Sequence, residues 1–140
     1  AQAYPQKSLL SDDLITRLKT IEVLNYVVNT IHGQGFTRIF TAEKYSEIPA
    51  EQERVQAQGR TLVSEYFMLA DEWLEGGGYL FGQFSIADAA LFYTEFWAKH
   101  IGLPLPSRCQ EHYRLMLTRA SVDQVMTEEG YGKMLSEIRR

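Results

Sequence analysis

The side chains that most often carry chemistry are thinly spread along this 140-residue chain. The three histidines, His32, His100 and His112, lie far apart and form no H-E-x-x-H arrangement, so we predict no metal site. The single cysteine, Cys109, lies near a predicted helix start, where the pKa of a thiol can be lowered. A partly buried, inert thiol is nevertheless the favoured interpretation of Cys109.

His32 is the histidine with the most informative neighbours. Glu22, Asn25, Asn29 and His32 are spaced by three, four and three residues, so they share one face of a predicted helix. Three interpretations are open. The residue pattern alone favours a solvated stripe, and the alternatives are a polar wall that lines a cleft and a subunit interface formed by Glu22, Asn25 and Asn29. Gly33 would let a ligand approach the backbone beside His32 closely.

Aromatic side chains suggest an apolar pocket in addition to the core. The residues that we expect to line it are Phe36, Phe40, Tyr93 and Trp97. Aromatic residues at helical spacing more often belong to a core. Tyr93 and Trp97, however, are i, i+4 neighbours with polar atoms on their rings, so at least one should reach solvent or a polar partner.

One local motif predicts the element that positions Tyr93 and Trp97. Ser85 and Asp88 form an S-x-x-D capping box, in which each side chain accepts a hydrogen bond from the backbone N–H of the other residue. The helix that follows, from Ile86 to about His100, is apolar on almost every face and should be buried. The residues behind that prediction are Ala87, Ala89, Ala90, Leu91, Phe92, Phe96 and Trp97.

The remaining segments are also predicted to be helical. Ser11 should cap a long amphipathic helix whose stripe is Leu14, Leu18, Ile21, Leu24, Val28 and Ile31, with a kink or break at Gly33 and Gly35. A second long helix should run from about Pro49 to the glycines at 76–78. Ser107 and Ser121 are candidate caps of two shorter helices, and one last turn or two should follow Gly130. No convincing strand is present, so the predicted fold is all-α, an irregular or orthogonal bundle of about five to seven helices.

Composition limits the possible functions. The net charge is −4 and the 14 basic residues are scattered, which argues against nucleic acid as a partner. No run of about 18 apolar residues is present, so we predict no membrane-spanning segment, and one cysteine excludes an internal disulfide. The chain is interpreted as a cytoplasmic protein, with residues 1–10 as a linker remnant and residues 11–140 as one domain.

Several separated motifs agree in order with one family. The segment from Phe84 to Ala89, continuing in register to Trp97, resembles the start of the buried helix in the C-terminal domain of glutathione S-transferases. The segment 24–40, with His32, resembles the first long helix of the bacterial, beta-like members. Arg119, Val122 and Glu129-Gly130 are similar to their closing R-P-x-V…E-G segment, although Ala120 replaces the usual proline. A lysine that usually follows the family histidine is also absent after His32.

This resemblance implies both a function and a missing part. The family's N-terminal thioredoxin-like domain binds glutathione and supplies the thiol-activating residue, so this segment should hold no catalytic residue and no cofactor, and should be inactive alone. Its expected role is to position a small hydrophobic electrophile for attack by glutathione, the co-substrate, in a detoxifying homodimer. His32, Phe36, Tyr93 and Trp97 are the expected substrate-binding residues.

Two other functions stay open. Domains of this family also serve as non-enzymatic protein-interaction modules in translation factors and tRNA synthetases. A two-domain protein of this kind can also bind glutathione or another ligand without turnover. The sequence upstream of residue 1 and a conjugation assay would distinguish these possibilities.

Overall fold

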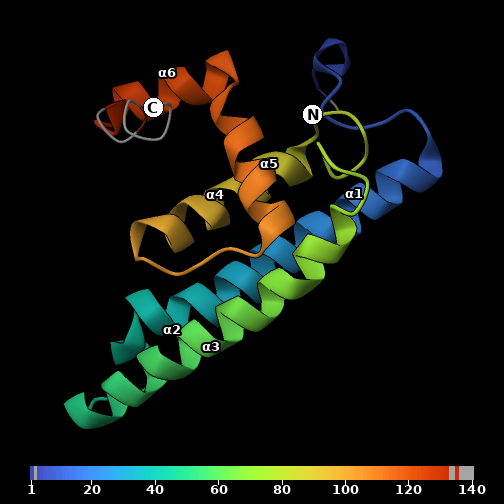
Figure 1. Ribbon diagram of the computed structural model, residues 1–140. Coiled ribbons are helices and arrows are strands. Elements are labelled where there is room, and N and C mark those ends of the chain that lie inside the picture. Colours follow the sequence, from blue (N-terminus) through green and yellow to red (C-terminus); the bar gives the residue numbers. More distant parts are fainter. Residues whose placement is uncertain (2, 133–134, 136–140) are drawn as a thin grey trace.

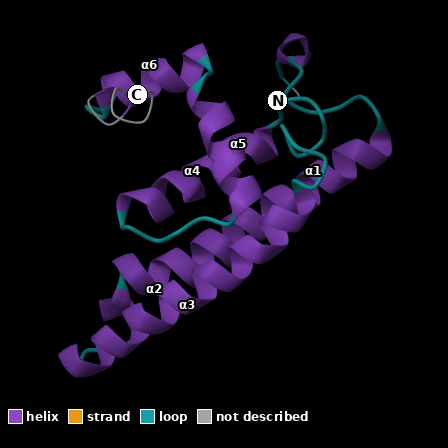
Figure 2. Ribbon diagram, in the orientation of Figure 1, coloured by secondary structure: helices purple, strands orange, loops and turns teal. Residues whose placement is uncertain are grey.

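A computed structural model describes residues 1, 3–132 and 135 of the chain. Regular structure in this part of the chain is entirely helical, which confirms the all-α prediction (Figure 2). The α-helices are α1 (Leu14–Tyr26), α2 (Thr37–Phe40), α3 (Pro49–Trp73), α4 (Ile86–His100), α5 (Ser107–Leu117) and α6 (Ala120–Glu128). A π-helical segment, η2 (Val27–Phe36), joins α1 to α2, and short 3-10 turns occur at η1 (Pro5–Lys7) and η3 (Ala42–Lys44). Most of the turns predicted after Gly130 lie outside the described residues.

Two long helical stretches form the base of the molecule. α1, η2 and α2 follow one another without interruption, and α3 packs along them (Figure 1). α4 packs against α1 and η2, and α5 contacts both α4 and α3. α6 follows α5 and lies on the side of α4 away from the long pair (Figure 1). This arrangement is the irregular bundle that the sequence predicts.

The break predicted at Gly33 and Gly35 does not occur, because the chain remains helical through both residues as η2. Gly35 is instead a point of close contact with α3. A Cβ atom built on Gly35 would lie 2.5 Å from Cγ2 of Val63. On the opposite helix, a Cβ atom on Gly59 would lie 2.8 Å from Cβ of Arg38. The two glycines therefore allow the long helices to approach closely because they lack a side chain. Their backbone flexibility is not needed at these positions.

The stripe predicted on the first long helix is divided between two faces. Leu14, Leu18, Ile21 and Val28 are 65 %, 55 %, 44 % and 46 % exposed, on the outward face. The side chains that α1 and η2 bury are instead Thr20, Val23, Val27 and Ile31. Both stripes have helical spacing and apolar members, so periodicity alone does not distinguish the inner face from the outer one.

The predicted capping box at the start of α4 is confirmed in both halves. The backbone N–H of Ser85 donates to Oδ2 of Asp88 at 2.7 Å, and the Ser85 hydroxyl accepts from the N–H of Ala87 at 3.2 Å. Asp88 is fully buried and also accepts from the N–H of Leu80, 2.8 Å from its Oδ1. This carboxylate therefore holds the preceding loop as well as the helix end.

The other predicted caps are wrong. Asp13, not Ser11, caps α1, with its Oδ2 accepting from the N–H of Thr16 at 2.8 Å. Ser107 and Ser121 lie inside α5 and α6, and neither helix has a side-chain cap from its own N-cap residue.

α5 obtains its cap from a residue distant in sequence. Oδ1 of Asp71, near the end of α3, accepts from the N–H groups of Arg108 and Cys109 at 2.8 and 3.1 Å. A carboxylate at this position satisfies N–H groups that have no partner within the helix and interacts favourably with the positive end of the helix dipole.

A buried cluster of charged groups connects α4 to α5. Nδ1 of His112 lies 2.9 Å from Oε2 of Glu95, and Nε2 lies 3.3 Å from Oδ1 of Asp88. All three side chains are fully buried. Because buried charges are tolerated only when they are paired, the imidazole and the two carboxylates depend on one another.

The environment shifts the pKa values of these three groups. Burial raises the pKa of Glu95 to about 7, against the opposing effect of His112. Burial disfavours the charged form of His112, but its contacts with Asp88 and Glu95 outweigh that effect and raise its pKa to about 9. Burial also opposes ionisation of Asp88, yet its contact with His112 and the hydrogen bonds from Leu80 and Ser85 lower its pKa overall. His112 is therefore an imidazolium at neutral pH.

Arg119 fixes the loop that precedes α4 to the start of α6. Its guanidinium carbon lies 3.5 Å from the ring centroid of Phe84, and Nη1 donates to the hydroxyl of Tyr79 at 2.8 Å. Cation–π contact of this kind stabilises an arginine against an aromatic face. The loop that carries Phe84 is thus held by Asp88 of α4 and by Arg119 at the start of α6.

Gly35→Ala should destabilise the protein by about 1–3 kcal/mol, because the new methyl group would overlap Val63. The double variant Gly35→Ala/Val63→Ala should recover part of that loss. Urea unfolding measures both, with Gly76→Ala, which meets no atom within 4 Å, as the control. Equal effects of the Gly35 and Gly76 substitutions would contradict the close contact.

Stability should fall as pH rises from about 6.5 to 9. The pKa of His112 is raised from 6.5 to about 9 in the folded state, so its contribution is fully present below 6.5 and is lost as pH rises through 9. The loss should be on the order of 3 kcal/mol, since one unit of pKa shift corresponds to about 1.4 kcal/mol.

Urea unfolding at several pH values tests this slope in a variant without the buried titrating pair, Glu95→Gln/His112→Gln. Its stability should change much less over that range. The exposed pair His100→Gln/Glu111→Gln is the matched control and should keep the slope. An unchanged slope in the buried-pair variant would show that other groups cause it.

Candidate functional site

An aromatic cluster forms around Trp97 where α4 faces η2 and α2. The Trp97 ring centroid lies 5.2 Å from that of His32, 5.4 Å from Phe36, 5.1 Å from Phe40 and 4.5 Å from Tyr93. The structure therefore brings together all four residues that the sequence suggests as substrate-binding, with Phe40 beside them. Edge-to-face pairs such as Phe36 with Trp97 stabilise such a cluster beyond the area that they bury.

The π-helical winding of η2 explains why His32 joins this cluster. In a regular α-helix, His32 would continue the face of Glu22, Asn25 and Asn29, all of which are exposed. A π-helix turns less per residue, because its hydrogen bonds span five residues in place of four. The residues of η2 are thereby rotated relative to α1, and His32 is half-buried against Trp97. The four polar residues thus do not form one continuous wall.

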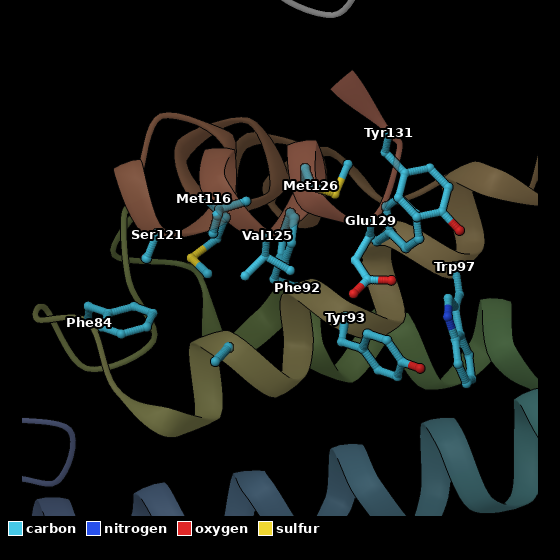
Figure 3. Close-up of a pocket in the computed structure, with 13 residues that line it drawn as sticks. Phe84, Phe92, Tyr93, Trp97, Met116, Ser121, Val125, Met126, Glu129 and Tyr131 are labelled. Carbon is cyan, nitrogen blue, oxygen red and sulfur yellow. The ribbon is translucent and has the colours of Figure 1, made fainter. Parts of the chain in front are cut away.

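An apolar pocket of about 570 Å³ lies between α4 and α6 (Figure 3). Its walls are mostly aromatic rings and aliphatic chains, a composition typical of small-molecule sites. The lining residues are Phe84, Ala89, Phe92, Tyr93, Phe96, Trp97, Met116, Ser121, Val122, Val125, Met126, Glu129 and Tyr131.

The four predicted substrate-binding residues have different relations to this pocket. Tyr93 and Trp97 line it, and Tyr93 is 51 % exposed. His32 and Phe36 do not line it but pack against Trp97, and Phe36 is completely buried. Contact with a substrate stays a prediction for each of them.

The α6 wall of the pocket was not foreseen from the sequence. Val122, Val125, Met126 and Glu129 have spacings of three, one and three residues, which place them on one helix face. That spacing is a usable signal for a shared helix face, on which Met126 is buried and Val125 is exposed. Tyr131 follows in the turn after α6, and its ring packs 4.9 Å from the centroid of Phe96.

Two groups that often act as a nucleophile or a base, Cys109 and His112, are buried and do not line this pocket. The thiol of Cys109 is fully buried, and burial together with Glu95 and Asp71 raises its pKa, so the inert interpretation of this cysteine is confirmed. His112 is occupied by its two carboxylate partners.

No described group of three or more His, Cys, Asp or Glu side chains is arranged to hold a metal ion. Among the described residues, no helix is long and apolar enough to cross a membrane.

Comparison with known proteins agrees with this architecture. A family model described as the glutathione S-transferase C-terminal domain matches residues 52–116. The chain is 32 % identical over 136 residues to the glutathione S-transferase GstA of Escherichia coli O157:H7, covering 93 % of this chain and 63 % of that protein.

A solved structure is similar over nearly the same extent. The glutathione S-transferase from Xylella fastidiosa matches with a TM-score of 0.79 and 25 % identity, covering 90 % of this chain and 63 % of that one. The chain therefore spans less than two thirds of the length of either relative. In sequence and in fold, the chain is therefore similar to the C-terminal domain of glutathione S-transferases.

Proposed function

We propose that this chain is the substrate-binding domain of a glutathione transferase. The observation that carries the proposal is the apolar pocket lined by Tyr93 and Trp97, in a fold similar to that of glutathione S-transferases. The pocket holds a small hydrophobic electrophile. A glutathione thiolate, bound mainly by a further polypeptide portion, attacks the electrophilic carbon. The C–S bond forms as the leaving group departs with its electron pair.

The aromatic cluster would set the orientation of the substrate. Trp97 packs against His32 and Phe36 of η2 and also lines the pocket. Its indole ring is therefore fixed by packing before a ligand arrives. His32 is half-buried and no described residue forms a hydrogen bond with its imidazole, so a ring N–H is free to donate to glutathione or substrate. Phe36 supports the ring from behind as part of the core.

Substrate binding and thiol activation then belong to two different parts of a longer protein. Activation of the thiol is assigned to the further polypeptide portion, so the 140-residue chain alone should not conjugate glutathione. Residues 1–10 would be the linker and residues 11–140 the helical domain. We further propose a cytoplasmic, detoxifying role, since hydrophobic electrophiles are the chemistry that such a pocket accepts.

The outward face of the first long helix suggests the dimer contact. Leu14, Leu18, Ile21 and Val28 form a stripe of exposed apolar side chains on α1 and η2. A contiguous exposed apolar stripe of this kind is more often an interaction surface than a surface that stays exposed to solvent. The proposed occupant is a second copy of this chain, because a two-fold pairing buries the same stripe on both partners.

In the longer protein, Trp97→Ala should raise KM for a bulky aromatic electrophile several-fold, because the substrate loses a wall of its pocket. Steady-state kinetics measure this, with Trp73→Ala as the control, since Trp73 packs on Tyr26 of the long pair. Unchanged kinetics together with a large loss of stability would show that Trp97 is only a core residue.

Ile21→Glu should shift the chain from dimer to monomer, because the buried stripe would acquire an unpaired charge. Sedimentation equilibrium measures the change. Val125→Glu, on the exposed α6 surface, is the control and should leave the dimer intact. A wild-type chain that is monomeric at high micromolar concentration would contradict the dimer proposal.

A further inference from the structure

The apolar pocket contains one charged residue among its described lining residues, and that residue is acidic. Glu129 follows directly after α6 and is an exposed residue that lines the pocket together with Tyr93, Trp97 and Tyr131 (Figure 3). Every other described lining residue is apolar, aromatic or uncharged.

Nothing in the described part of the chain neutralises this carboxylate. No ion pair or side-chain hydrogen bond to Glu129 occurs there, and the last turn of α6 contains no basic residue. The C-terminal end of a helix carries a partial negative charge, which adds to that of the carboxylate. Among the described residues, the charges at this end of the pocket are therefore negative.

The aromatic rings around Glu129 also favour a positively charged ligand. Tyr93, Trp97 and Tyr131 present aromatic faces, whose quadrupole attracts cations. A cation held between these rings and a carboxylate gains from both interactions, whereas an anion of the same shape is repelled by both. Apolar contacts with Phe92, Val122 and Met126 would serve either ion equally.

We propose that this pocket binds hydrophobic organic cations, with Glu129 and the rings of Tyr93, Trp97 and Tyr131 holding the positive centre. The aryl or alkyl groups of the ligand occupy the apolar part of the pocket toward Phe84 and Met116. This inference rests on the proposed function in one respect, namely that this pocket is the electrophile site. It adds a charge preference: cationic electrophiles should be favoured over anionic ones.

A pair of probes with nearly the same shape and opposite charge tests this preference. Isothermal titration of the 140-residue chain with tetraphenylphosphonium and with tetraphenylborate measures both affinities in one buffer. Tetraphenylphosphonium should bind about tenfold more tightly, which corresponds to about 1.4 kcal/mol. Equal affinities, tighter binding of the borate, or binding of neither ion would overturn the inference.

Three variants assign the preference to the named groups. Glu129→Gln should weaken tetraphenylphosphonium binding about fivefold and should not weaken tetraphenylborate binding. Glu128→Gln, the neighbouring carboxylate that does not line the pocket, is the matched control and should change neither. Val125→Trp should block both ions, because Val125 is exposed and its enlargement fills the pocket without disturbing the core.

The outcomes separate this inference from the proposed function. If both ions bind equally and Val125→Trp removes both, the pocket is a binding site without a charge preference, so the proposed function stands and the inference fails. If Glu129→Gln and Glu128→Gln have the same effect, the preference arises from net charge and the assignment to Glu129 fails. A longer protein without conjugating activity would refute the proposed function and would leave a measured cation preference unaffected.

Discussion

A helix that begins inside a protein must satisfy its first backbone N–H groups without water, and α4 begins inside this one. The carboxylate of Asp88 meets this requirement together with Ser85, and it also accepts from Leu80 in the preceding loop. Its contact with His112 joins the start of α4 to α5. Every other feature of the site depends on this arrangement, because it sets the direction in which α4 presents Tyr93 and Trp97.

The position of α4 also explains why binding and chemistry are separate in this chain. One side of the helix packs against the long pair, where Trp97 meets His32 and Phe36. The other side lines the pocket together with α6. Two of the groups with strongly perturbed pKa values, Glu95 and His112, hold α4 and α5 together, and they are too deeply buried to reach a ligand. Perturbed pKa values here indicate a structural ion pair rather than a reactive centre.

Contacts between distant segments determine how the long helices support α4. Asp71 of α3 caps α5, which keeps His112 opposite Glu95. Gly35 and Gly59 allow η2 and α3 to approach closely, so that η2 can present His32 and Phe36 to Trp97. The two glycines have helical backbones, and the small size of their side chains is what the contact requires.

The sequence by itself determined the all-α class and the start of α4, because the Ser85–Asp88 box spans only four residues and needs no distant partner. It also placed Tyr93 and Trp97 on one helix turn, since an i, i+4 relation follows from helical geometry alone. Only the tertiary structure decided which apolar stripe of α1 faces inward, because both stripes share the same periodicity. It likewise decided that Asp71 caps α5, that the winding of η2 brings His32 to Trp97, and that Glu129 lines the pocket. These features join residues that are far apart in the chain or depend on helix winding, so their cause lies in packing and not in residue spacing.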